Sequence, residues 1–200
     1  MEDSLPQLLS NKDLDRLRAY RENLDFYNGG QWTTEVRHHE RRLTFNYAKV
    51  FIDKVTSYLM SGVTFAVDPV EDSDEARKRA QKAETALYQV YQDNNLEQLD
   101  FETEVDCAIL GDAGYKVIWD PEIKSVRVTA PDIQGICAWW VGDDVSRVWR
   151  VTSKYALSAE AAENLYGVRP KDKTATVVEV WTARDFELWI DDTAVGKKPN

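Results

Sequence analysis

The prevailing spacing of apolar residues changes near Gly111, and this change constrains the fold more than any other feature. Before Gly111, most apolar side chains recur every three or four residues, which is the repeat of a helix packed on one side. After Gly111, they alternate with polar side chains in short runs separated by turn residues, which is the repeat of β-strands. The sequence therefore predicts an α+β fold, in which N-terminal helices are followed by a mostly antiparallel β region.

Four helices are expected before Gly111. They cover about residues 11–28, 47–61, 73–93 and 96–110, each with apolar side chains at helical spacing. Asn46 is the expected N-cap of the second helix, and Gly62 is expected to end it. Val63, Phe65 and Val67 then alternate with other residues, which predicts a strand that ends at Pro69.

The β part is expected to begin with two strands around the turn at 120–122. Further strands are predicted within residues 135–141, 146–155 and 176–191, interrupted by a short helix at 158–167. Nothing after the strand pair at 181–191 is predicted to close this sheet. We therefore expect the 200 residues to be the front part of a longer polypeptide.

Charge and composition argue against several classes of protein. The formal net charge is −10, which disfavours tight wrapping of nucleic acid, because such wrapping needs lysine and arginine to displace counterions. No apolar run approaches the roughly 20 residues of a membrane span, and the acidic N-terminus is unlike a signal peptide. Cys107 and Cys137 form no disulfide framework, so we expect two reduced, half-buried thiols in a cytoplasmic protein.

Two clusters could carry metal chemistry, and each has a simpler explanation. The run 38–40, His-His-Glu, has the residue types of a metal site, but the chain contains no other histidine and a zinc site needs further ligands. Asp112 with Glu122 and Lys124 has the carboxylates and lysine of Mg²⁺-dependent nucleases. Glu122 and Lys124 fall in a turn between two strands, however, which favours a structural role for the turn.

Aromatic residues and glycines give no stronger sign of a ligand site. Trp139-Trp140 and Trp149 could stack on bases, but few cations lie among them, so packing in a core or interface is favoured. Gly29-Gly30 follows a helix, whereas a phosphate-binding loop precedes one. The sequence therefore predicts no catalytic residue, no metal and no cofactor.

The stretch from Tyr27 to Gly62 contains a series of motifs: Tyr27, Gly29-Gly30, Gln31, Arg41-Arg42, Asn46-Tyr47, Phe51-Ile52-Asp53 and Tyr58-Leu59-Met60-Ser61-Gly62. This series resembles the N-terminal region of tailed-bacteriophage portal proteins, the head–tail connectors of double-stranded DNA phages. Further on, residues 111–119 and 178–188 resemble two strand motifs of the same family. The similarity covers most of the chain.

The resemblance implies that the chain builds part of the outer wing of a ring. Residues 1–110 would form the helical part of the wing and 111–200 its β-rich part, truncated before the stem and clip. Nine residues would then make packing or subunit contacts: Tyr27, Gln31, Arg41, Arg42, Asn46, Tyr47, Asp53, Tyr58 and Gly62.

The second helix is apolar on several sides, which is what an element needs if it packs on its own domain and also on a neighbour. We expect Ile52 and Val55 to be buried. Asp53 is expected to be held by a polar partner, such as an arginine of the 37–42 loop, because an unpaired carboxylate on a largely apolar helix is costly.

The resemblance also implies a function. The chain would be a structural subunit of a dodecameric portal ring at the capsid vertex of the virion, assembled in the host cytoplasm, through which double-stranded DNA is packaged and ejected and to which the tail attaches. The implied partners are other copies of the chain, the terminase large subunit, the major capsid and scaffolding proteins, the head–tail adaptor, and DNA that passes without tight binding. No membrane is implied.

Two alternatives stay open from the residues themselves. One is a metal-dependent phage nuclease that uses Asp112, Glu122 and Lys124, and the other is an acidic protein-interaction module.

Overall fold

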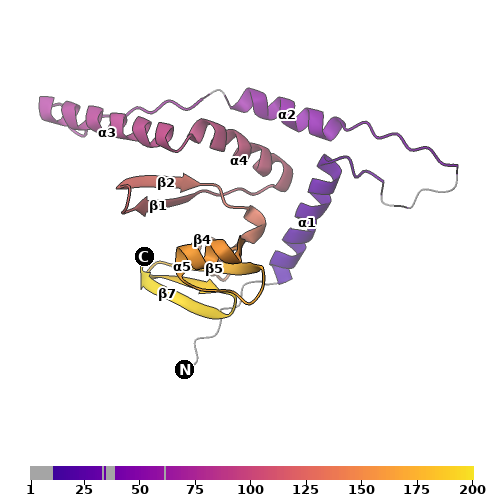
Figure 1. The fold of residues 1–200 in the computed structure, drawn as a ribbon. Coiled ribbons are helices and arrows are strands. Elements are labelled where there is room, and N and C mark those ends of the chain that lie inside the picture. Colours follow the sequence, from indigo (N-terminus) through magenta and orange to yellow (C-terminus); the bar gives the residue numbers. More distant parts are fainter. Residues whose placement is uncertain (1–10, 33, 35–38, 61) are drawn as a thin grey trace. The chain divides into compact units, whose positions relative to one another are not determined.

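The structure is a computed structural model that describes residues 11–32, 34, 39–60 and 62–200. Helices come first and antiparallel strands follow (Figure 1), so the predicted α+β class is confirmed. The chain forms two compact units. The helical unit contains residues 19–130, and the sheet unit contains residues up to Arg18 together with 131–200.

The boundary between the compact units differs from the point at which helices give way to strands. The last long helix ends at Leu110, whereas the units divide after Arg18 and after Ala130. The assignment of residues 1–110 and 111–200 to the helical and β-rich parts of a wing concerns the assembled ring, so it stays a prediction.

The helices form within two residues of the predicted bounds. They are α1 (Asn11–Tyr27), α2 (Tyr47–Leu59), α3 (Asp74–Asp93) and α4 (Leu96–Leu110). The side chain of Asn46 accepts a hydrogen bond from the backbone N–H of Lys49, which caps α2 as expected. Gly111 ends α4 with a φ of 89°, a left-handed conformation that glycine adopts without strain.

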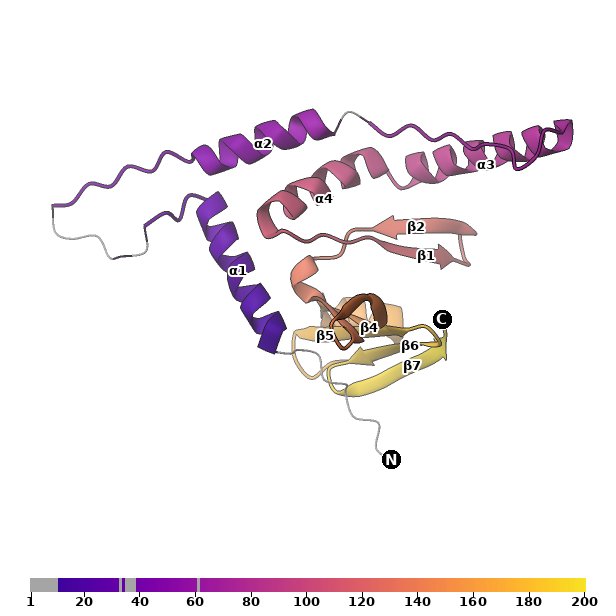
Figure 2. The same ribbon diagram turned by 180° about the vertical axis from the view of Figure 1, so that it is seen from behind.

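A two-stranded hairpin completes the helical unit. Its strands are β1 (Lys116–Asp120) and β2 (Ser125–Thr129), paired antiparallel. The outer edge of β2 is covered by the side chain of Asn94, which donates to the carbonyl of Val126 at 2.9 Å and accepts from the N–H of Val128 at 2.8 Å. The side chain of Asn94 therefore bonds backbone groups of β2 that a third strand would otherwise bond. Figure 2 shows the hairpin beside α3 and α4.

The strand predicted at residues 63–67 is wrong, because the extended segment 62–69 pairs with no strand. The N–H of Phe65 instead donates to the hydroxyl of Tyr88 at 3.2 Å. The ring of Phe65 meets those of Tyr88 and Tyr91 edge-on, with centroids 5.3 and 5.5 Å apart. The alternation of apolar residues therefore reflects a segment packed along α3.

The sheet unit is built on one five-stranded antiparallel sheet whose strands follow the order of the chain. The strands are β3 (Ile136–Val141), β4 (Asp144–Ser158), β5 (Thr174–Thr182), β6 (Asp185–Ile190) and β7 (Thr193–Pro199), preceded by a short 3₁₀ turn at Ile133–Gly135. The helix α5 (Ala159–Tyr166) packs on one face (Figure 1), where Ala162 joins Val177 and Ile190 in the core.

The strand β7 corrects the expectation that nothing after Asp191 closes the sheet. It pairs with β6 over its whole length, from Ile190↔Thr193 to Asp185↔Pro199. The sequence hides this strand because Gly196, Lys197 and Lys198 are poor strand formers. They suit a strand at the edge of a sheet, where lysines oppose pairing with another chain.

Candidate subunit-contact site

The side of α2 that contains Thr56 is buried, and the opposite side, which carries aromatic residues, is exposed. Thr56 is 1% exposed, whereas Tyr47, Phe51 and Tyr58 are 74%, 69% and 72% exposed. With about 100° of rotation per residue, the three aromatic residues share one side of the helix and Thr56 lies on the opposite side. The packing of α2 on α4 is therefore made by the less apolar side, and the aromatic side has no neighbour among the described residues.

The expected burial of α2 is partly wrong. Ile52 is half-buried, on the same side as Thr56, but Val55 is exposed. The helix is apolar on several sides, as predicted, and within the described part of the chain only one of those sides is packed.

A polar cluster joins the end of α1 to α2. The hydroxyl of Tyr27 donates to the carboxylate of Asp53 at 2.6 Å, and Lys49 donates to the same hydroxyl at 2.9 Å. The hydrogen bond to Tyr27 raises the pKa of the Lys49 ammonium. The side-chain amide of Asn46 donates to the backbone carbonyl of Tyr27 at 2.7 Å. Three of the candidate residues, Tyr27, Asn46 and Asp53, are thus brought together.

The expectation that a polar partner holds Asp53 is confirmed, but the partners are not the arginine of the 37–42 loop that was given as an example. Tyr27 and Lys49 hold the carboxylate instead, with Lys49 at 3.9 Å. Of the loop residues, Arg42 pairs with Glu40 at 2.7 Å. Arg37 and His38 lie outside the described residues.

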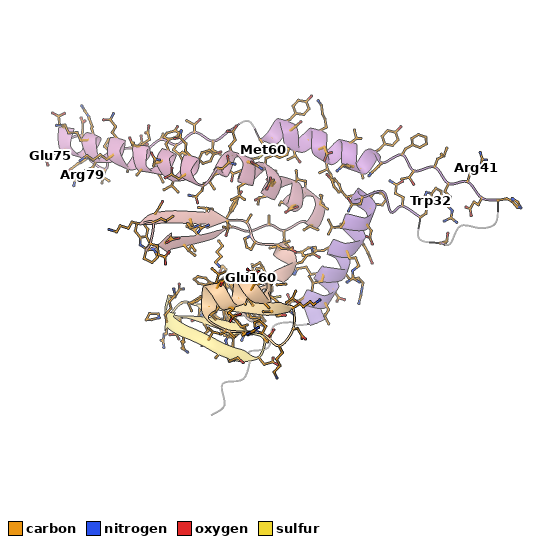
Figure 3. All side chains as sticks on the ribbon, viewed as in Figure 1. Trp32, Arg41, Met60, Glu75, Arg79 and Glu160 are labelled. Atoms are coloured by element: carbon orange, nitrogen blue, oxygen red, sulfur yellow. The ribbon has the colours of Figure 1, made fainter. Side chains whose placement is uncertain are left out.

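The other candidate residues are spread over the segments on either side of α2. Figure 3 labels Arg41 and Trp32 between α1 and α2 in the chain, and the guanidinium of Arg42 lies 5.1 Å from the centre of the Trp32 ring. Gln31 is half-buried in the turn after α1. That turn needs glycine, because a Cβ on Gly30 would come within 2.8 Å of the carbonyl oxygen of Asp25. Gly62 is exposed, with a φ of 96°.

An acidic groove lies between α4 and the Tyr27–Asp53 cluster. Its volume is about 640 Å³, and it is lined by Tyr27, Asp53, Phe101, Glu102, Val105 and Asp106. We call it the α4 groove. Sequence reasoning missed it, although one signal was available: α4 carries five acidic residues and no lysine or arginine. The pairs 101–102 and 105–106 recur one helical turn apart, so they share one side of the helix.

The residues considered for a nuclease site do not converge. The carboxylate of Asp112 accepts a hydrogen bond from the hydroxyl of Tyr20. Glu122 and Lys124 lie in the exposed turn between β1 and β2, and the whole of β1 separates them from Asp112 along the hairpin. This geometry offers no shared metal position for the two carboxylates.

Other candidate chemistry is equally weak within the described residues. No group of three or more histidine, cysteine, aspartate or glutamate residues there could hold a metal ion. Cys107 is half-buried and Cys137 is buried, and both are free thiols. Burial raises the pKa of the Cys137 thiol, which disfavours the reactive thiolate. No described helix is long and apolar enough to cross a bilayer.

Two tryptophans of the sheet unit, Trp139 and Trp149, lie beside one cation. The guanidinium of Arg150 lies 3.9 Å from the centre of the Trp139 ring and 4.9 Å from that of Trp149. These rings therefore pack against an arginine of their own sheet.

The exposed aromatic side of α2 is a surface of the kind that a partner covers. A sequence model of the family described as phage portal protein, SPP1 Gp6-like, matches residues 7–196. The chain therefore belongs to this family of phage portal proteins, which are structural proteins of the virion at the capsid vertex. No curated protein matches the chain significantly.

Proposed function

We propose that this chain is a subunit of the portal ring through which double-stranded DNA is packaged and ejected, and to which the tail attaches. The observation that carries the proposal is the family match over residues 7–196. The exposed aromatic side of α2 supports it, because a ring subunit needs surfaces that are covered only by its neighbours.

The proposed partners follow from this role. Besides copies of the same chain in a dodecameric ring, they are the terminase large subunit that drives packaging, the major capsid and scaffolding proteins, and the head–tail adaptor. Assembly would take place in the host cytoplasm. The net charge of −10 suits a conduit, since phosphate groups would not be held by a surface that repels them.

Electron microscopy of the purified protein, with analytical ultracentrifugation at several concentrations, tests the proposal. We expect closed rings of uniform diameter and a large sedimenting species. A chain that stays monomeric at every concentration would contradict the role of a self-assembling subunit.

We also propose that the chain has no hydrolytic activity of its own. Supercoiled plasmid with Mg²⁺, and ATP in a separate assay, should both remain intact. The control is Glu122→Ala, which removes the exposed carboxylate of the β1–β2 turn. Plasmid cleavage by the native chain that disappears in this variant would favour the nuclease alternative.

A further inference from the structure

We propose that the α2 aromatic face of one copy docks against the α4 groove of the next copy in the ring. The α2 aromatic face consists of Phe45, Tyr47, Val50, Phe51, Lys54 and Tyr58. The inference rests on the proposed function, because it names the two surfaces through which neighbouring subunits would meet.

The α2 aromatic face has the composition of an interface. Phe45 and Tyr47 stack with ring centroids 6.2 Å apart, and the ammonium of Lys54 lies 4.7 Å from the Tyr58 ring. All of its large apolar side chains are exposed. Such a concentration of exposed aromatic side chains is typical of a surface that a partner covers.

The two surfaces are complementary in charge. The cation of the α2 aromatic face is Lys54, and Arg41 lies just before this face, whereas Lys49 and Arg42 are paired with Asp53 and Glu40. The helix α4 carries five acidic residues and no basic one. Phe101 and Val105 contribute apolar side chains to the lining of the groove, and Glu102 and Asp106 contribute carboxylates. An aromatic surface edged with lysine and arginine matches both properties of this groove.

The charges also decide in favour of a head-to-tail contact. If two α2 aromatic faces met around a twofold axis, Lys54 and Arg41 of one copy would approach the same cations of the other. The groove instead opens on the Asp53 side of α2, whereas Phe51 and Tyr58 lie on another side. Two different surfaces on one unit give a contact that each copy can repeat with the next, which is the contact that closes a ring.

Cross-linking between defined positions tests the contact directly. Ser57→Cys places a thiol beside Lys54, and Ala108→Cys places one on α4 a turn beyond Val105. Both positions are exposed and neither belongs to the two surfaces as defined. Both variants also carry Cys107→Ala, because Cys107 is a half-buried thiol on α4. Each is purified alone with a distinct tag, and the two are mixed before assembly and treated with a short bismaleimide.

We expect cross-linked pairs in the mixture and none in either variant alone. Cross-links in the Ser57→Cys variant alone would show a twofold contact between aromatic faces and would overturn the proposal. Intact rings without any cross-link would overturn the docking but leave the ring. A chain that forms no ring under any condition would overturn both the docking and the proposed function.

Charge reversal provides an independent test. Lys54→Glu and Glu102→Lys change exposed side chains, so their circular dichroism and melting should match those of the native chain. Each should raise the concentration needed for half-assembly by about tenfold, and the double variant should restore it, because the reversed charges face each other again. Single variants that assemble like the native chain, or a double variant no better than the singles, would overturn the proposal.

Discussion

The hydroxyl of Tyr27 donates a 2.6 Å hydrogen bond to the carboxylate of Asp53, and this bond ties the end of α1 to the middle of α2. Lys49 donates a hydrogen bond to the same hydroxyl, and its ammonium lies 4.3 Å from the centre of the Tyr27 ring. Tyr27 therefore contacts both the carboxylate of Asp53 and the ammonium of Lys49. The cluster fixes the rotation of α2 about its own axis. With Asp53 held toward α1 and Thr56 toward α4, the aromatic residues of α2 have to face away from both.

Removing this hydrogen bond should destabilise the protein modestly. Tyr27→Phe deletes the hydroxyl while keeping the ring. We expect the free energy of unfolding to fall by about 0.5–1 kcal/mol. This value is at the lower end for an intramolecular hydrogen bond because Asp53 is half exposed. The measurement is urea unfolding of the native chain and the variant at low protein concentration. Tyr58→Phe is the matched control, since Tyr58 lies on the exposed side of the same helix and should change stability little. Equal effects of the two substitutions would show that the Tyr27 bond contributes nothing specific.

The side chain of Asn94 should matter more than its position in a helix-to-helix turn suggests. Its amide bonds the carbonyl of Val126 and the N–H of Val128, and it also donates to the carbonyl of Val90 at 2.9 Å. Asn94→Ala leaves the half-buried carbonyl of Val126 and N–H of Val128 without this partner, whereas the carbonyl of Val90 keeps the backbone N–H of residue 94 at 3.2 Å, so we expect a loss of about 1–3 kcal/mol. Faster amide hydrogen exchange at Val128 should accompany it. Asn28→Ala, at an exposed site, is the control, and unchanged exchange at Val128 in the Asn94 variant would refute the role assigned to this amide.

Structural features were predicted correctly where the residues that determine them lie close together in the sequence. Helix ends were predicted within two residues because caps such as Asn46 and Gly111 act on residues within one turn of themselves. The prediction that Gly62 ends α2 was wrong, since the C-cap is Met60. The extended segment around Phe65 was predicted as a strand because apolar and other residues alternate in it. Alternation shows that the two sides of a segment differ, but it does not show whether a strand or a helix covers the apolar side. β7 was missed because its own residues have a low strand propensity. It forms a strand through its pairing with β6, which its local sequence does not show.

The candidate site shows the same limit. Tyr27, Asn46 and Asp53 were singled out by resemblance to a family, and they do converge. The choice of Val55 as a buried residue failed because hydrophobicity alone does not tell which of several apolar sides meets α4. The groove at Phe101 was invisible for a related reason: it exists only once α4 and α2 are packed together.

An ion pair at the sheet edge should make stability depend on pH. The ammonium of Lys197 lies 2.8 Å from Glu187 across β6 and β7, and its hydrogen bond lowers the pKa of the Glu187 carboxyl below the ordinary 4.5. Because the folded-state pKa is lowered, the stabilisation is full at neutral pH and is lost as the pH falls through 4.5 and then through the lower folded value.

Lys197→Met should therefore cost about 0.5 kcal/mol at pH 7 and almost nothing at pH 3, measured by urea unfolding at both pH values. Lys171→Met is the control for loss of a lysine at an exposed position elsewhere in the sheet unit. A difference between native and variant chains that is as large at pH 3 as at pH 7 would mean that Lys197 acts through packing.

Binding of double-stranded DNA should be weak and should vanish at moderate salt. The net charge of −10 repels phosphate at long range, and the three arginines at positions 37, 41 and 42 of the sequence are too few to reverse this over the whole surface. Arg42 is moreover paired with Glu40, so about three phosphate contacts are an upper bound. Each contact contributes about −0.9 to the slope of log affinity against log salt, which gives a slope near −3 and a loss of about 40-fold between 50 and 200 mM salt.

Fluorescence anisotropy of a labelled duplex at both salt concentrations measures this slope. Arg41→Ala should lower its magnitude by about one, because it removes one cation, whereas Glu122→Ala, which removes an exposed carboxylate in the β1–β2 turn, should leave it unchanged. Weak contacts suit a conduit, since DNA held tightly by phosphate contacts would resist the movement that packaging and ejection require. Nanomolar binding that persists at 200 mM salt would instead identify an acidic protein with a concentrated DNA-binding surface, and the passive channel proposed for this chain would be wrong.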